Sequence, residues 1–162
     1  MINGDIEKEH RQVFLVVMES NIDMKTSLYY TCRMAKRVNG RIALLYVVEP
    51  SDFVEWQSVG NLLQEQQRQE AEQVLQKAAG EVQRQSGITP ALFIREGKKI
   101  DETAQLIQEE QTISALVIIV DVVGKTPGTI SSQWNAKLSA RLKIPLIIVP
   151  NNLTEEDIQR VT

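Results

Sequence analysis

One short segment combines the residue types of a phosphate-binding loop. It follows an apolar run at 115–121 and contains Gly124, Lys125, Gly128, Ser131 and Ser132. Glycines let backbone N–H groups approach phosphate oxygens, and lysine and hydroxyl side chains add charge and hydrogen bonds. The segment predicts either a nucleotide phosphate site or a plain turn in which Ser131 or Ser132 caps a helix.

The spacing excludes the two common glycine fingerprints. A Walker A loop would need its first glycine five residues before Gly124, where Ile119 stands inside the apolar run. The pattern G-x-G-x-x-G is also missing from this segment. The triplet Gly124-Lys125-Thr126 by itself arises often by chance, so the segment does not define a nucleotide site on its own.

Other chemistries have few residues to work with. His10 is the only histidine and stands in a polar N-terminal segment, which speaks against histidine catalysis. Cys32 is the only cysteine, which excludes an internal disulfide and a multi-cysteine metal site. It falls on an apolar helical stripe, so we predict a buried core thiol. We therefore expect no metal site and no enzymatic activity.

Composition narrows the class of protein. The 162 residues, 43% hydrophobic and 24% charged, suit one globular domain. A net charge of -3 argues against a nucleic-acid partner. No apolar run reaches the roughly 18–20 residues of a membrane helix, and the first residues are too polar for a signal peptide. We expect a cytoplasmic protein without a membrane partner.

On both sides of this loop, short apolar segments alternate along the chain with segments of helical periodicity. Strands are predicted at 13–18, 41–50, 91–96, 115–121 and 144–150. Helices are predicted at about 24–39, 62–85 and 100–110, with a fourth after the loop at about 134–142. The stripe of the 62–85 helix is made by Leu62, Ala71, Val74, Leu75, Ala78, Ala79 and Val82. The eight glutamines between Gln64 and Gln85 are interpreted as its solvated face.

This alternation predicts a three-layer α/β/α sandwich around a five-stranded parallel sheet, of Rossmann-like or flavodoxin-like type. The predicted strand order is 3-2-1-4-5. We divide the chain into an N-terminal arm (1–12), one domain (13–150) and a C-terminal tail (151–162), in which Thr154 and Asp157 form a capping box. Ligands of such sheets bind outside the carboxyl ends of the strands.

Several segments together resemble the universal stress protein family, over about residues 12–150. They are VFLVVMESN, LLYVVEP, REGKKIDETAQLIQEE, ALVIIV and IPLIIVP. Many members of that family bind ATP through G-x-x-G, nine residues, then G-[ST]. Aligned on this chain, the first glycine falls on Asp121, the second on Gly124 and the third on Trp134, and the hydroxyl residue falls on Asn135. The resemblance also places Glu19 at the family's aspartate and Val47 beside the adenine.

These departures predict little or no ATP binding. Trp134 fills space that glycine leaves open, and Asp121 and Glu19 bring carboxylates toward the phosphates. Two unit charges about 4 Å apart interact by roughly 4 kcal/mol at an effective dielectric of about 20. The alternative is a nucleotide switch that binds ATP with Mg²⁺, in which the ion bridges carboxylate and phosphate and Lys125 assists.

The resemblance further implies a homodimer formed through the last strand, at about Leu146–Val149. An apolar strand at a sheet edge invites such pairing. Phe53 and Trp56, in the connection after the second strand, either join a partner surface or pack onto the chain's own helices. The sequence thus predicts a non-catalytic stress-response protein that acts through protein partners it does not identify.

Overall fold

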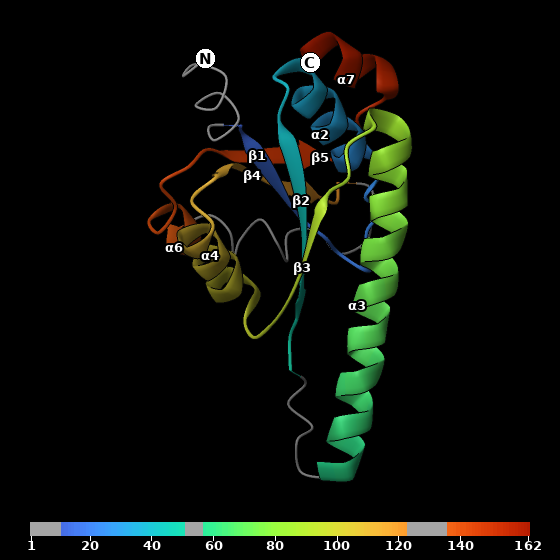
Figure 1. The fold of residues 1–162 in the computed structure, drawn as a ribbon, viewed down its shortest axis with the longest axis vertical. Helices are drawn as coiled ribbons and strands as arrows, with labels where there is room; N and C mark the ends of the chain where they lie inside the picture. Colours follow the sequence, from blue (N-terminus) through green and yellow to red (C-terminus); the bar gives the residue numbers. More distant parts are fainter. Residues whose placement is uncertain (1–10, 51–56, 123–135) are drawn as a thin grey trace, which may run out of the picture.

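The computed structural model describes residues 11–50, 57–122 and 136–162. The described residues form a five-stranded sheet with helices on both faces (Figure 1). The strands are β1 (Val13–Val17), β2 (Arg41–Val48), β3 (Ala91–Glu96), β4 (Ile113–Val120) and β5 (Leu146–Pro150). The helices are α2 (Lys25–Arg37), α3 (Gln57–Ser86), α4 (Lys99–Glu109), α6 (Ala136–Ser139) and α7 (Glu155–Val161).

The strand order is β3-β2-β1-β4-β5 and every pairing is parallel, which confirms the predicted topology and fold class. β1 occupies the centre, where Leu15 pairs with Ala43 of β2 and with Leu116 of β4. The winding reverses on either side of β1. All five carboxyl ends therefore meet at one edge of the sheet, and the crevice at this reversal lies between β1 and β4.

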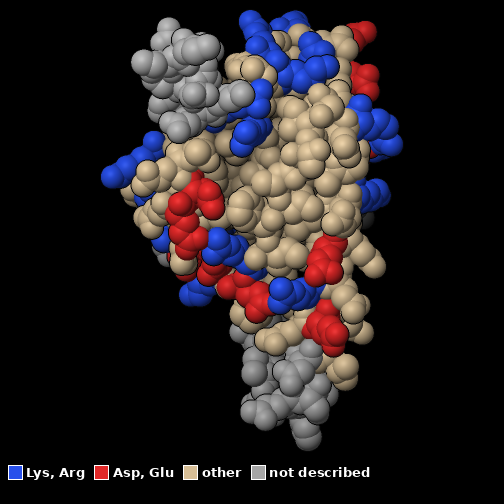
Figure 2. All heavy atoms as spheres, in the orientation of Figure 1, with Lys and Arg blue, Asp and Glu red and all other residues tan. Residues whose placement is uncertain are grey.

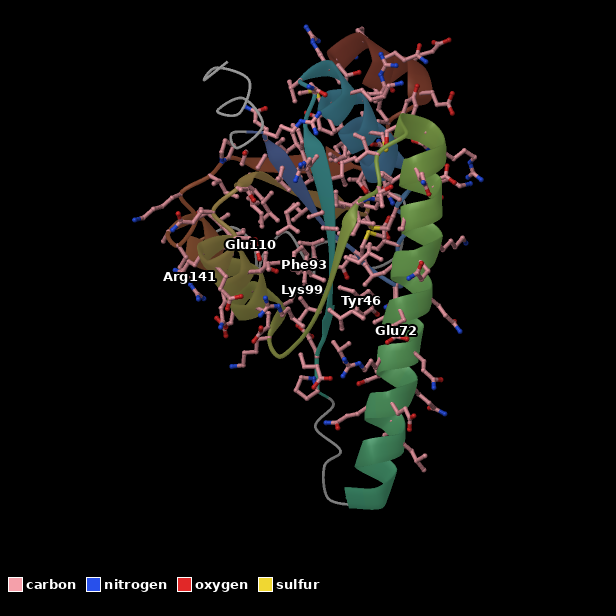
Figure 3. The ribbon with its side chains drawn as sticks, viewed as in Figure 1. Tyr46, Glu72, Phe93, Lys99, Glu110 and Arg141 are labelled. Carbon is pink, nitrogen blue, oxygen red and sulfur yellow. The ribbon has the colours of Figure 1, made fainter. Side chains whose placement is uncertain are left out.

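Each face of the sheet packs its own core. On one face α2 and α3 cover a cluster that includes Val16, Leu44 and Val117. On the other face α4 and α6 cover a cluster that includes Leu15, Leu45 and Leu116. Figure 3 shows side chains of two neighbouring strands on opposite faces, with Tyr46 of β2 toward α3 and Phe93 of the edge strand β3 toward α4. Because both faces are covered, the central strands are apolar without interruption.

Helix α3 is longer than the sequence predicted. Its 30 residues span about 45 Å at about 1.5 Å per residue, and its first turns extend past the sheet (Figure 1). Ala71, Leu75, Ala78 and Val82 are buried as predicted. The placement of Leu62 on the buried stripe was wrong: its side chain is 63% exposed, because it precedes the part of α3 that reaches the sheet. Most of the glutamines are exposed, as predicted.

Other boundaries differ by a few residues. β4 begins at Ile113 rather than 115 and β5 begins at Leu146 rather than 144, because pairing with the neighbouring strand, not apolar content, sets the ends. Cys32 is a buried free thiol, as predicted. The predicted capping box at α7 is present: Thr154 Oγ1 accepts from the Asp157 N–H, and Asp157 Oδ2 accepts from the Thr154 N–H.

The core predicts a matched pair of substitutions. Leu44 is fully buried at the centre of β2, whereas Leu92 on the edge strand β3 is 36% exposed. Leu44→Ala is expected to lower the free energy of unfolding by about 2–5 kcal/mol through lost burial and a residual cavity. Leu92→Ala is expected to cost less than about 1 kcal/mol. Urea unfolding followed by circular dichroism measures both, and equal losses would contradict the described burial.

Candidate functional site

The carboxyl edge of the sheet gathers polar side chains from three strand ends. Glu19 follows β1, Glu49 follows β2 and Asp121 follows β4. Lys99, the first residue of α4, approaches the same edge (Figure 3). These residues lie far apart in the sequence, and only the parallel pairing of their strands brings them to one side of the sheet.

Glu19 and Lys99 form an ion pair in which one ammonium contacts both oxygens of the carboxylate. The Lys99 Nζ donates to both carboxylate oxygens of Glu19, at 2.9 Å to Oε1 and 2.8 Å to Oε2. The two side chains are only 14% and 20% exposed, respectively. The pair is thus largely withdrawn from water, where removing one partner leaves a costly uncompensated charge.

Burial raises the pKa of the Glu19 carboxyl above its ordinary value of 4.5. The Lys99 ammonium opposes that shift by its charge and its hydrogen bond, while nearby Glu49 adds to the rise. The balance shows that desolvation of Glu19 outweighs the ion pair. Glu19 therefore takes up a proton more readily than an exposed glutamate does.

The start of α4 is held by the same group of residues. Glu49 Oε1 accepts a hydrogen bond from the Lys99 N–H at 3.1 Å and so satisfies a free donor of the first helical turn. Gly97 precedes the helix with φ 146°, and a Cβ at this position would lie 2.7 Å from Glu102 Oε1. The positive φ favours glycine at this position, immediately before the helix that carries Lys99.

Asp121 is bound by a residue that follows β5. Asn151 Nδ2 donates to Asp121 Oδ1 at 2.9 Å, and Asn151 Oδ1 accepts from the Val122 N–H at 3.0 Å. The Asn151 carbonyl oxygen also accepts from Thr26 Oγ1 of α2 at 3.2 Å. Asn151 therefore joins the ends of β4 and β5 to α2 and orients the Asp121 carboxylate.

A small cavity opens beside Glu19. Its volume is about 260 Å³, and apolar side chains of the two helices, Leu28 from α2 with Val74 and Ala78 from α3, form much of its wall. Ligand sites in proteins usually measure about 300–1,000 Å³. This cavity is thus slightly smaller than the usual ligand pocket.

The structure covers only part of the predicted nucleotide site. Glu19 and Asp121 lie at the carboxyl edge, as predicted, but each is bound to a different partner. Val47 is buried, 5% exposed, within the core cluster under α4. The remaining residues of the prediction lie outside the described residues, namely Gly124, Lys125, Gly128, Ser131, Ser132, Trp134 and Asn135, as do Phe53, Trp56 and His10.

Sequence reasoning missed Lys99, Glu49 and Asn151. A signal for Lys99 existed, because a lysine at the first position of a helix opposes the helix dipole unless an acid compensates it. Asn151 gave no such signal, since asparagine after a strand is common in turns. Among the described residues there is no cluster of three or more potential metal ligands and no helix able to cross a membrane.

Comparison with known proteins agrees with this architecture. A model of the universal stress protein family matches residues 10–150. The chain belongs to the universal stress protein family. The structure is similar to a universal stress protein from Lactobacillus plantarum, with a TM-score of 0.69, 14% identity and coverage of 86% of this chain and 97% of that chain. No curated protein matches the chain.

Two further universal stress proteins illustrate the range of the likeness. One from Burkholderia pseudomallei has a TM-score of 0.66 and 20% identity, covering 85% of this chain and 95% of that chain. One from Arabidopsis thaliana, solved with AMP bound, has a TM-score of 0.60 and 18% identity, covering 92% and 98%. At identities of 14–20% the likeness establishes the shared fold only. It does not show that the side chains at the carboxyl edge are the same in these proteins.

The Glu19–Lys99 pair predicts a pH effect. Because the folded pKa of Glu19 lies above 4.5, its contribution to stability is fully present below that pH and is lost as the pH rises through the folded pKa. Lys99→Gln removes the main group that lowers this pKa, so the Glu19 pKa is expected to rise further and the loss to extend to higher pH. Carbon-13 NMR titration of the Glu19 carboxyl measures the shift.

Lys98→Gln is the matched control. Lys98 carries the same charge one residue earlier, is exposed and is not among the groups that shift Glu19. It should leave the titration nearly unchanged. An equal rise of the Glu19 pKa in both variants would show that general charge, not the direct contact, determines it.

Proposed function

We propose that this universal stress protein is a non-catalytic, homodimeric stress-response protein that binds ATP weakly or not at all and acts through protein contacts. The observation that carries this proposal is the Glu19–Lys99 ion pair at the carboxyl end of β1. Glu19 takes the position at which the family resemblance places an aspartate, and its carboxylate engages the Lys99 ammonium. A phosphate would have to compete with Glu19 for that ammonium.

The charge at the edge supports weak ATP binding. Glu19 and Glu49 bring two carboxylates to the single ammonium of Lys99, so these three groups sum to -1 when ionised. A polyanion placed among them meets net repulsion, and the low exposure of Glu19 reduces the screening by water.

Isothermal titration calorimetry with ATP, with and without Mg²⁺, tests the proposal directly. We expect no saturable heat with ATP up to millimolar concentration. Saturation at micromolar ATP would refute the proposal. It would support the alternative, an ATP switch in which Mg²⁺ bridges phosphate to a carboxylate and the strand-4 loop contributes Lys125. The AMP bound by the Arabidopsis relative is the observation that supports this alternative.

Glu19→Gln separates repulsion at the edge from loss of the site. The substitution removes one negative charge and frees Lys99 Nζ, so ATP affinity is expected to rise by roughly tenfold, which corresponds to about 1.4 kcal/mol. Glu156→Gln on the exposed face of α7 removes the same charge elsewhere and should have no effect. Unchanged affinity in Glu19→Gln would mean that the edge charge does not limit nucleotide binding.

The homodimer rests on the edge strand β5. Within the described residues β5 pairs only with β4, and Ile148 is 48% exposed in its middle. Antiparallel pairing of Leu146–Val149 with a second copy would satisfy the free backbone groups of the edge and cover Ile148. The opposite edge strand, β3, exposes Leu92 to 36% and provides the natural comparison.

Sedimentation equilibrium tests the dimer with a matched pair of variants. Ile148→Lys places a charge in the proposed interface and is expected to convert the dimer to a monomer. Leu92→Lys makes the same change at the other edge and should leave the dimer intact. A monomeric native protein, or a dimer lost only in Leu92→Lys, would overturn the assignment of β5 as the interface.

A further inference from the structure

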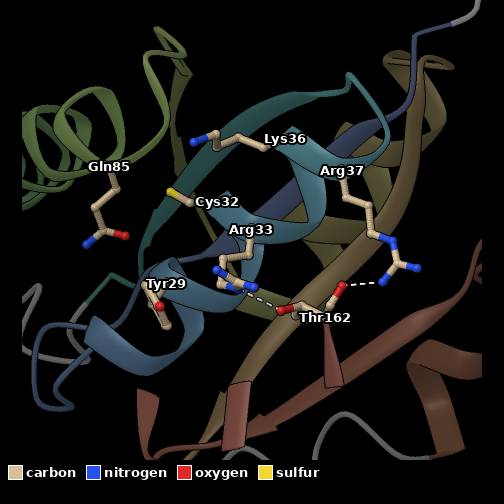
Figure 4. A pocket seen from close by; sticks show the side chains of 7 residues that line it. All are labelled: Tyr29, Cys32, Arg33, Lys36, Arg37, Gln85 and Thr162. Carbon is tan, nitrogen blue, oxygen red and sulfur yellow. Dashed lines mark hydrogen bonds between the residues drawn. The ribbon is translucent and has the colours of Figure 1, made fainter. Parts of the chain in front are cut away.

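A second pocket lies at the C-terminal half of α2, away from the carboxyl edge. It has a volume of about 400 Å³ and is lined by α2, by Gln85 near the end of α3 and by Thr162 after α7. Figure 4 shows three basic side chains of α2 around it, Arg33, Lys36 and Arg37. In Figure 2 blue Lys and Arg atoms gather at this end of the molecule, although the whole chain carries a net charge of -3.

The three basic side chains line the same pocket. Within the described residues none of them forms a salt bridge with an aspartate or glutamate. Arg33 and Arg37 stand four positions apart on the same face of α2, where like charges repel. A bound anion would relieve this repulsion.

Two of the three cations are already oriented. The Arg33 Nε donates to Thr162 Oγ1 at 2.7 Å, and the Arg37 guanidinium donates to the main-chain oxygen of Thr162, the last residue of the sequence. The Arg33 guanidinium also stands 5.9 Å from the centre of the Tyr29 ring. These contacts use only part of the arginine donors, since each guanidinium has five N–H groups. The Lys36 ammonium has no hydrogen-bond partner among the described residues and can reach a ligand.

The opposite wall offers an acceptor. Gln85 Nε2 donates to Glu81 Oε1 at 2.6 Å, which fixes the orientation of the amide, and Gln85 Oε1 is buried without a partner in the described structure. Figure 4 shows this oxygen on the side of Cys32. Buried oxygens without a donor are rare in proteins. A ligand hydroxyl entering between Gln85 and Cys32 would supply one.

We propose that this pocket binds the phosphate group of a small phosphate monoester. Arginine forks and a lysine ammonium are the side chains that best match a phosphate dianion. The phosphate would lie against Lys36 and the free N–H groups of Arg33 and Arg37. A hydroxyl of the same ligand would donate to Gln85. This site is separate from the carboxyl edge, so it stands whether or not ATP binds there.

A simpler account of the basic residues explains only part of the arrangement. Lys36 and Arg37 lie in the last turn of α2, where positive charge complements the helix dipole. Arg33 lies a turn earlier, and it docks α7 together with Arg37. Neither role involves the unpartnered oxygen of Gln85, and neither requires an open pocket beside Lys36.

NMR titration of the full chain tests the proposal with two probes, inorganic phosphate and glycerol 3-phosphate, at ionic strength held constant with NaCl. We expect saturable shifts of the backbone amides at 29–37 and of the Gln85 side-chain amide with both. Tighter binding of glycerol 3-phosphate would identify the ester as the ligand. Equal affinity would identify free phosphate and remove the hydroxyl from the proposal.

Lys36→Gln is the decisive variant, because Lys36 is exposed and its ammonium has no hydrogen-bond or ion-pair partner among the described residues. It is expected to weaken binding at least tenfold. Lys143→Gln removes an exposed lysine outside the pocket and should change the affinity by less than about twofold. No shifts at 29–37, shifts confined to the carboxyl edge, or equal weakening by both variants would overturn the proposal.

Discussion

The parallel pairing of β1 with β2 on one side and β4 on the other is the constraint on which the rest of the molecule depends. It buries the middle strand on both faces and requires a covering helix layer on each. It also places the carboxyl ends of all strands at one edge. The polar residues that follow the strands must therefore share that edge, whatever chemistry they perform.

That edge is acidic and internally bonded. Glu19 is held by Lys99, and Asp121 is held by Asn151. In an open α/β sheet the same position ordinarily receives a ligand. Here the chain's own side chains make the interactions that a ligand would make, and burial keeps the Glu19 pKa high. The family fold is preserved, and at this edge its polar side chains bond to one another.

Positive charge gathers instead around the pocket of Arg33, Lys36 and Arg37, between the C-terminal halves of α2 and α3 and the end of α7. The net charge of -3 for the whole chain does not reveal that basic side chains gather around this pocket. Thr162, which follows α7, contacts two arginines of α2 and so joins the end of the chain to this pocket.

The sequence by itself determined the local features: five apolar strands, the buried Cys32 and the capping box of Thr154 with Asp157. Each depends on residues a few positions apart, or on apolar periodicity that burial enforces. Only the tertiary structure decided that Lys99 meets Glu19 across 80 positions. It likewise decided that Leu62 stays exposed and that three helices enclose a basic pocket. Such contacts depend on strand register and helix length, which side-chain patterns do not encode locally.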